Sequence, residues 1–308
     1  MQTHIFKPDL PPPTMSVGAL GWLKANLFSN WFNTLLTLLA LYLIWLMVPP
    51  LLQWAIFDAN WVGSTRADCT KEGACWVFIQ QRFGQFMYGF YPGELRWRVD
   101  ATIWLAIVGA APLFVPQMPR KAVYGVAFLV IYPIIAWCLL HGGVFGLSVV
   151  PTSRWGGLML TLVIAYVGIT GALPLGILLA LGRRSNLPAI KVICVTFIEF
   201  WRGVPLIIVL FMSSVMLPLF LPEGMSLDKL LRALVMVIFF EAAYIAEVVR
   251  GGMQAIPKGQ YEAAAAMGLG YWRTMGLVIL PQALKLVIPG IVNTFIALFK
   301  DTSLVIII

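Results

Sequence analysis

Charged residues are scarce in this sequence. Only 11% of its 308 residues are Asp, Glu, Lys or Arg, 60% are hydrophobic, and the mean hydropathy is +0.89. Soluble domains carry roughly 25% charged residues because their surface must be polar, and disordered chains combine low hydrophobicity with high charge. The composition therefore excludes both classes and predicts that most of the chain lies in a lipid bilayer.

Residues that bind metals and nucleotides are also few. The two histidines, His4 and His141, lie far apart, and the four cysteines are not spaced as metal ligands. No Gly-Lys dipeptide occurs, so the chain lacks the Gly-x-x-x-x-Gly-Lys-Ser/Thr loop that holds nucleotide phosphates. We therefore expect this chain itself to bind no metal, no cofactor and no ATP.

The sequence has long apolar runs instead. Several are far longer than a barrel strand of about 9–11 residues, which favours helices. The sequence thus predicts an all-α, polytopic membrane protein with a tail at 1–33 and a polar external loop at 58–100. Pro49 and Pro50 are expected to kink or end the first helix. Seven complete spans are expected, at 34–57, 101–118, 122–140, 155–182, 192–221, 230–249 and 277–299.

The net charge of +8 does not indicate nucleic-acid binding, because the basic residues stand in short clusters between apolar runs. In the expected topology these clusters all face one side of the membrane, and the positive-inside rule assigns that side to the cytoplasm. The N-terminal tail is then cytoplasmic. The clusters are Arg120/Lys121, Arg183/Arg184/Lys191 and Arg250/Lys258/Arg273.

The C-terminal end carries an incomplete apolar run. A new run begins at Thr302 and stops at Ile308, whereas a spanning helix needs about 20 residues. We therefore expect this chain to hold seven complete spans and a truncated last span.

The segment between the sixth and seventh expected spans is typical of a short cytoplasmic helix. Pro257 suits the first turn of a helix, residues 262–267 are strong helix formers, and Gly268 can end the helix. Four consecutive alanines offer almost no side-chain bulk, so the surface of another protein can approach the helix backbone closely. A helix with so little apolar area has no reason to insert into lipid.

The same segment resembles the EAA loop of ATP-binding-cassette (ABC) importer permeases. That loop has Glu-Ala-Ala, three residues, Gly, nine residues, an aliphatic residue, any residue, and Leu-Pro. Within residues 251–281 the matching positions are Glu262, Ala263, Ala264, Gly268, Val278, Leu280 and Pro281. Other segments resemble the polar-amino-acid branch of those permeases, at 202–206, 243–252, 259–264, 280–283 and 300–304. The front part, around 73–79 and 91–98, resembles the M-type permeases of bacterial general L-amino acid uptake systems.

The resemblance implies a type I ABC importer permease core at 155–308, preceded by an extension at 34–154 with three more spans. It implies an L-amino acid importer subunit of the bacterial inner membrane. The implied partners are a second permease subunit, two ATP-binding cassette subunits that bind ATP and magnesium, a periplasmic amino-acid-binding protein and membrane lipid. In this resemblance Glu262 contacts the ATPase, the alanines permit close docking, and Gly268 turns the chain back toward the membrane.

Three ionisable residues within apolar spans are candidates for the substrate pathway, because such residues are costly in a bilayer and mark functional sites. Glu199 and Arg202 are three residues apart and can pair across one helical turn. A structural pair at the cytoplasmic interface explains them equally well. Glu241 lies deeper in its span, where it either lines the translocation path or caps a helix partner.

A further polar group, Lys300, Asp301, Thr302 and Ser303, separates the last complete span from the run that follows. One interpretation is a Lys/Asp pair with a Ser/Thr N-cap at the outer interface. The other is that the group faces the cavity with Asn293 and binds the ammonium and carboxylate of a zwitterionic substrate. The N–H groups at the start of the next helix would then assist.

Cys69 and Cys75 share a polar loop, where their spacing permits a disulfide in an oxidising periplasm without requiring one. Two other function classes place their own requirements on the sequence. A secondary, ion-driven amino acid transporter would need an internal repeat with interrupted helices in both halves. An intramembrane enzyme would need clustered Asp, His or Ser/Lys chemistry at membrane depth. The sequence favours neither.

Overall fold

The computed structural model describes residues 18–70, 72–222 and 227–305. The chain divides into two compact units, Met1–Phe83 and Gly84–Ile308. Five segments of the described chain are long and apolar enough to cross a membrane, and a sixth qualifies if one bent helix pair counts as a single span. The predicted polytopic all-α fold is confirmed. Residues 1–17 of the expected tail and 306–308 of the incomplete run lie outside the described residues.

In the first unit, α1 (Gly18–Asn26) precedes the first span, α2 (Trp31–Leu52). Asn30 caps α2, because its side-chain oxygen accepts a hydrogen bond from the Asn33 N–H at 2.7 Å. No residue of α2 is buried. This exposure suits an apolar helix whose side chains contact lipid.

The two prolines near the end of α2 do not end the helix, contrary to one of the outcomes predicted. Pro49 and Pro50 lie inside α2, and the chain continues through Leu52 into one π-helical turn, η1 (Gln53–Phe57). The Gln53 N–H bonds to the carbonyls of Pro49 and Pro50. The wider turn therefore finds acceptors for the N–H groups that follow the prolines.

The stretch predicted as an external loop, 58–100, contains helices, and its last residues, from Gly93 on, belong to the second candidate span. After a short turn come α3 (Trp76–Tyr88), η3 (Gly93–Leu95) and α4 (Arg96–Ala110). The second span begins at Gly93 rather than 101 because its charged residues find partners. Arg98 is 3% exposed and donates to the carbonyl oxygen of Ser148 at 2.8 Å and to its hydroxyl at 3.0 Å.

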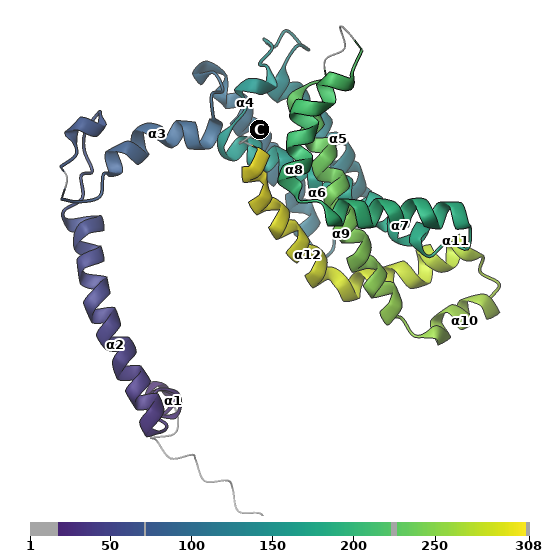
Figure 1. Ribbon diagram of the computed structural model, residues 1–308, viewed down its shortest axis with the longest axis horizontal. Helices are drawn as coiled ribbons and strands as arrows, with labels where there is room; N and C mark the ends of the chain where they lie inside the picture. The colour runs from purple at the N-terminus through teal and green to yellow at the C-terminus, as the bar shows by residue number, and fades with distance from the viewer. Residues whose placement is uncertain (1–17, 71, 223–226, 306–308) are drawn as a thin grey trace, which may run out of the picture. The chain divides into compact units, whose positions relative to one another are not determined.

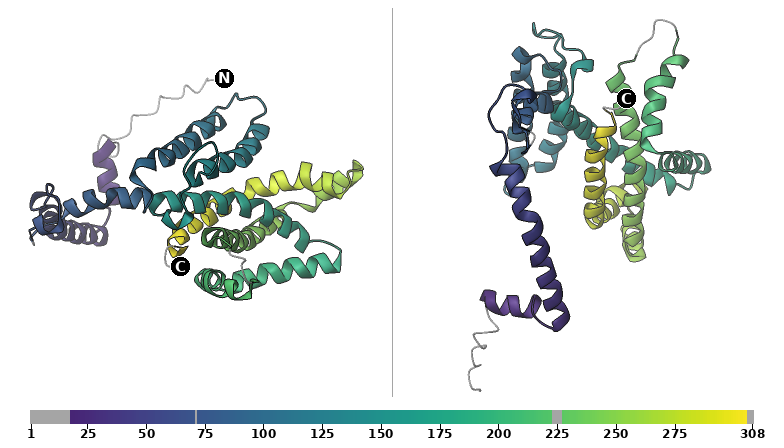
Figure 2. Two further views of the ribbon diagram at one scale, coloured as in Figure 1. Left: turned by 90° about the horizontal axis from the view of Figure 1, so that it is seen from above. Right: turned by 60° about the vertical axis from the view of Figure 1, so that its left-hand side comes forward.

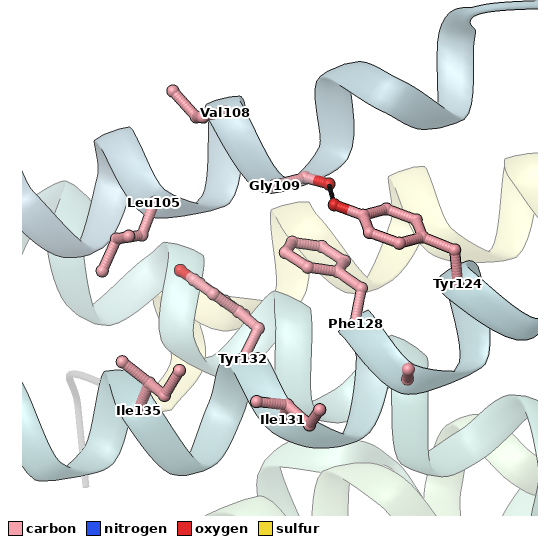
Figure 3. Close-up of a pocket in the computed structure, with 9 residues that line it drawn as sticks. Leu105, Val108, Gly109, Tyr124, Phe128, Ile131, Tyr132 and Ile135 are labelled. Atoms are coloured by element: carbon pink, nitrogen blue, oxygen red, sulfur yellow. Dashed lines mark hydrogen bonds between the residues drawn. The ribbon is translucent and has the colours of Figure 1, made fainter. Parts of the chain in front are cut away.

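Helices α4 and α5 (Lys121–His141) form an antiparallel hairpin, joined through η4 (Ala111–Phe114) (Figure 2). The Tyr124 hydroxyl of α5 donates to the Gly109 carbonyl of α4 at 2.7 Å. Next to this bond lies a cavity of about 320 Å³ between the two helices, lined by apolar side chains and by the rings of Phe128 and Tyr132 (Figure 3). The hairpin is thus held by spaced aromatic contacts and leaves a gap between its helices.

Helix α5 is linked to the fourth span, α6 (Gly157–Arg183), at a proline. Pro133 has no N–H to donate to the carbonyl of Leu129 four residues earlier. The Tyr166 hydroxyl of α6 donates to that carbonyl at 3.5 Å, and the Tyr166 ring packs edge-on against Tyr132 with centroids 5.0 Å apart. A residue of one span therefore satisfies a backbone acceptor that a proline has freed in another.

The centre of the second unit consists of α6, α9 (Lys229–Ala255) and α12 (Leu280–Val305), which pack against one another (Figure 1). Small residues bring the helices close. A Cβ added to Gly176 of α6 would lie 2.9 Å from the Ala242 carbonyl oxygen of α9, and one added to Gly252 of α9 would lie 2.7 Å from the Ala283 carbonyl oxygen of α12. Glycine and alanine at such contacts let backbones approach in lipid.

The predicted fifth span, 192–221, is broken at Val204 and Pro205. α7 (Pro188–Gly203) and the segment from α8 (Leu206–Phe211) to Phe220 meet at an angle of 101°. Val204 is extended, with φ −108° and ψ 130°. The following residue, Pro205, disfavours the α conformation at Val204 and cannot donate an N–H, so the helix ends before it.

The predicted break near residue 300 does not occur. α12 is continuous from Leu280 to Val305, so Lys300 to Ser303 lie inside a helix, and no new helix begins at Thr302. The hydroxyls of Thr302 and Ser303 donate to the carbonyls of Phe299 and Lys300 at 2.8 and 2.9 Å. These side chains therefore bond within their own helix instead of capping another.

Candidate functional site

The predicted cytoplasmic helix is present as α10 (Lys258–Ala266). It follows Pro257 and ends in a Schellman motif. The Gly268 N–H bonds to the Ala265 carbonyl at 2.9 Å, and the Leu269 N–H bonds to the Ala264 carbonyl at 3.1 Å. Gly268 has φ +71°, a conformation that favours glycine. The predicted helix terminator therefore does end α10, which lies at the opposite end of α12 from its C-terminus (Figure 1).

Helix α10 presents most of its surface outward. Of its four alanines only Ala264 is buried; Glu262, Ala263, Ala265 and Ala266 are exposed. Met267, just beyond the helix, is 79% exposed. Pro281, at the end of the EAA-like segment, is exposed on the first turn of α12. The surface is thus a short strip of methyl groups with one carboxylate and one thioether.

Tyr261 attaches α10 to the helices behind it. Its hydroxyl accepts a hydrogen bond from Arg184 Nη1 at 2.9 Å and donates to the Met253 carbonyl at 3.1 Å. The Arg184 guanidinium also lies 5.4 Å from the centroid of the Tyr261 ring, which adds a cation–π attraction. α10 is therefore tied to the C-terminal ends of both α6 and α9.

Glu199 and Arg202 do not form the pair across one helical turn that their spacing allows. Glu199 accepts from Arg183 Nη1 at 2.9 Å, and Arg202 lies 3.9 Å from Glu247. Their side chains point toward other helices, so partners from α6 and α9 replace the pair within the turn. They belong to a charged network that joins the C-terminal ends of α6 and α7 to Glu247 of α9.

Glu241 lies inside the apolar bundle. It is 3% exposed, and its Oε2 has no hydrogen-bond partner among the described residues. Asp301 of α12 is close enough for electrostatic interaction with Glu241. The structure therefore brings together two carboxyl groups that the sequence placed in separate spans. Uncompensated buried charge is costly, so this region suits a site that a cation, a proton or a substrate ammonium completes.

The other candidates on α12 divide between two faces. Thr302 is 3% exposed, whereas Asn293, Lys300 and Ser303 are exposed. In a continuous helix, residues seven apart lie on one stripe, so Asn293 and Lys300 lie on one side of α12 and Thr302 on the opposite side. Asn293 and Lys300 can face a common cavity, but Thr302 cannot face it with them.

Cys69 and Cys75 form a disulfide in the first unit. Next to it, the Trp61 and Trp76 rings stack with centroids 5.5 Å apart. The backbone N–H groups of Thr65 and Ser64 donate to Asp68 and hold the pKa of its carboxyl below the usual value. The segment is thus a locally ordered structure outside the spans.

Sequence reasoning assigned no functional role to Arg183, Arg184, Glu247 or Tyr261. The two arginines were interpreted only as a topology signal, and Glu247 as part of a family segment. For the two arginines the sequence does offer one signal, because they stand side by side at the end of a predicted span. Among the described residues, no group of three or more His, Cys, Asp or Glu side chains could hold a metal ion.

Comparison with known proteins gives a consistent result. Residues 172–308 match the family model described as "Binding-protein-dependent transport system inner membrane component". The chain is 64% identical over 301 residues to the inner membrane amino-acid ABC transporter permease protein YhdY of Escherichia coli (strain K12), covering 98% of this chain and 82% of that protein.

Two further relatives are more distant. The glutamate/glutamine/aspartate/asparagine transport system permease protein BztC of Rhodobacter capsulatus is 39% identical over 372 residues, covering 99% of this chain and 85% of that protein. The glutamate/aspartate import permease protein GltK of Escherichia coli O6:H1 is 35% identical over 165 residues, covering 51% of this chain and 74% of that protein.

Proposed function

Because this chain belongs to the binding-protein-dependent transport system inner membrane components, and within them to the amino-acid ABC transporter permeases, we propose that it moves L-amino acids from the periplasm to the cytoplasm. It does so as one of two permease subunits. Two separate ATPase subunits supply the energy, and a periplasmic binding protein delivers the substrate. The basic clusters in alternate connections support a cytoplasmic N-terminus in the bacterial inner membrane.

The observation that carries the coupling proposal is the surface of α10. The helix is short and exposed, and its alanines leave the backbone open to a partner. Two ordered features, the Schellman turn at Gly268 and the Tyr261 contacts, hold it in a fixed orientation. In the proposal the ATPase groove receives α10, Glu262 contacts the groove, and Ala263 allows close approach. Ala264 is buried on the opposite face and packs α10 against the rest of the chain. Pro281 begins the return to the membrane.

Replacing Gly268 with valine tests this role. Nothing lies within 4 Å of an added Cβ at Gly268, so the effect arises from the backbone conformation at φ +71° and not from a clash. An L residue in this conformation costs about 1–2 kcal/mol, so α10 changes its exit direction. We expect the complex to assemble but ATP hydrolysis no longer to drive uptake.

The matched control is Gly251→Val. Gly251 is also open to an added Cβ, but it lies inside α9 without a positive φ. Uptake into proteoliposomes and ATP hydrolysis are measured for both variants. Normal coupling in Gly268→Val would contradict the docking role of α10.

Energy supply is tested independently of any variant. We expect the chain to co-purify with an ATPase subunit and with a periplasmic amino-acid-binding protein, and uptake to stop when ATP is depleted. Uptake that continues on a proton gradient without ATP would instead indicate a secondary, ion-driven transporter.

The substrate pathway is proposed to pass between α9 and α12. Glu241 and Asp301 provide negative charge for the substrate ammonium, and Lys300 with Asn293 provides groups for its carboxylate. Thr302 and Ser303 bond within α12 and keep it continuous. The predicted help from a helix N-terminus is dropped, since no helix begins there.

Asp301→Ala tests the pathway. We expect uptake to fall on the order of tenfold, or about 1.4 kcal/mol, together with weaker stimulation of ATP hydrolysis by the loaded binding protein. Lys285→Ala, at an exposed position of the same helix, is the control. Unchanged uptake and unchanged stimulation in Asp301→Ala would remove Asp301 from the pathway.

A further inference from the structure

Two neighbouring arginines at the end of α6 contact different parts of the molecule. Arg183 is the last residue of α6 and Arg184 is its C-cap. Arg184 contacts Tyr261 of α10. Arg183 Nη1 donates to Glu199 of α7 at 2.9 Å and to Glu247 of α9 at 2.6 Å. One residue thus contacts the docking helix, and the next contacts the helices of the bundle.

Glu247 is the centre of the inner contact. Its side chain is 15% exposed, and three arginines surround it. Besides Arg183, Arg250 donates to Oε2 from both Nε and Nη2, at 3.0 and 2.7 Å, and Arg202 lies 3.9 Å away. A poorly exposed carboxylate with several cationic partners holds those partners in one arrangement. Glu247 therefore links the ends of α6, α7 and α9.

Tyr261 is the centre of the outer contact. Its single hydroxyl bonds to both α6, through Arg184, and α9, through the Met253 carbonyl. Another polar attachment of α10 is the Gln282–Gln260 amide pair at 3.1 Å, which is exposed, as is the Arg184–Tyr261 bond. The amide pair joins α10 to α12, whereas Tyr261 joins it to α6 and α9, so a displacement of α10 reaches Arg184 through Tyr261.

The peptide bond joins the two contacts. Consecutive Cα atoms stay 3.8 Å apart across a trans peptide, so a shift of Arg184 that follows Tyr261 moves the backbone of Arg183 as well. Arg183 then loses or changes its bonds to Glu199 and Glu247. The structure shows the inner network intact.

We propose that Arg183 and Arg184 are positioning residues that transmit the movement of α10 to α7 and α9 during transport. The inference rests on the proposed docking role of α10. It adds that the signal passes through the side chains Tyr261, Arg184, Arg183 and Glu247 in that order. The signal therefore does not depend only on the covalent connection between α9 and α10.

The experiment uses the whole reconstituted complex and measures ATP hydrolysed per amino acid imported. For Arg183→Gln we expect this ratio to rise on the order of fivefold, as for a coupling energy of ordinary size. Arg183→Lys is expected to stay near the wild-type ratio, because both bonds come from one nitrogen and an ammonium can donate to both carboxylates. Arg120→Gln, an exposed arginine at another connection, is the control.

Two further variants complete the test. Tyr261→Phe removes the hydroxyl and with it both hydrogen bonds of the outer contact, while the ring beside Arg184 remains. It provides a measurement even if Arg183→Gln does not assemble. We expect it to raise the same ratio. The double variant Arg183→Gln with Glu247→Gln is expected to be no worse than the more severe single variant, because both interrupt one contact.

The outcomes separate this inference from the docking role. If Gly268→Val is uncoupled while Arg183→Gln and Tyr261→Phe keep the wild-type ratio, α10 docks but the arginines do not transmit, and the inference is wrong. If Gly268→Val also keeps the wild-type ratio, the docking role itself fails. An equal effect of Arg183→Lys and Arg183→Gln would likewise overturn the proposed transmission through charge.

Discussion

Helices α5 and α6 are both strongly apolar spans, yet one residue is buried in α5 and ten are buried in α6. Hydropathy therefore identified both spans but did not distinguish a peripheral helix from a central one. The difference lies in side-chain size. α6 has Gly168 and Gly176 at its contacts with neighbouring helices, whereas the contacts of α5 with its neighbours use the rings of Tyr124, Phe128 and Tyr132.

The two kinds of contact depend on different forces. In lipid, apolar area alone does not bring helices together, so close packing and internal polar bonds decide association. α6 and α9 use close packing of small residues. The α4–α5 hairpin uses spaced hydroxyl-to-carbonyl bonds and leaves a cavity between its helices.

The largest expected effect comes from adding bulk at the centre. Gly176→Val places a branched side chain 2.7–2.9 Å from Ile245 and the Ala242 carbonyl, so α6 and α9 must separate. We expect a loss of about 3 kcal/mol in the free energy of unfolding, measured by denaturant titration in mixed micelles. Gly125→Val in α5 is the matched variant, because an added Cβ there makes only an ordinary 3.5 Å contact with Leu113. An equal loss in the free energy of unfolding for Gly125→Val would contradict the proposed difference between the central and the peripheral helix.

A smaller effect is expected where the periphery relies on a buried polar group. Arg98→Met removes both bonds to Ser148 and leaves its carbonyl without those donors. A lost partner of a buried polar group costs about 1–3 kcal/mol, so we expect about 2 kcal/mol by the same titration. Arg96→Met, two residues earlier and close to the Tyr88 ring, is expected to cost less. Equal losses of unfolding free energy in the two variants would show that the burial of Arg98 does not determine its contribution to stability.

The smallest effect concerns the contact between the two helices compared. Tyr166→Phe removes the donor to the Leu129 carbonyl, and at 3.5 Å this bond contributes about 0.5 kcal/mol. In a Pro133→Ala background the loss should vanish, because the alanine N–H takes the same carbonyl. A Tyr166→Phe effect of the same size in both backgrounds would mean that the hydroxyl serves another purpose.

Some of this structure could be predicted from the sequence because it depends on local chemistry. The apolar runs predicted five of the spans and the bent sixth candidate, and Gly268 predicted the end of α10, since both follow from composition or from one backbone conformation. The helix at the predicted span 230–249, α9, is not among the candidate spans. The EAA-like segment was also recognisable by its spacing, and the similarity to known permeases confirms the family that it indicated.

Several of the failures share one cause, which is that a partner distant in the chain decides the outcome. Arg98 enters a span because Ser148 receives it, so the boundary of the loop at 58–100 could not be read from charge alone. Glu199 finds Arg183 on α6 instead of Arg202 one turn away. The continuity of α12 through Lys300 and Asp301 depends on their surroundings in the bundle, although the sequence there contains four polar residues in a row.

The contact at Pro133 also affects the order in which the spans assemble in the membrane. The Leu129 carbonyl leaves the ribosome 37 residues before Tyr166, so α5 enters the membrane while its acceptor has no protein partner. Lipid cannot donate a hydrogen bond to it. α5 therefore reaches its final state only after α6 has been synthesised and has packed beside it, which sets the earliest point at which these two helices can pair.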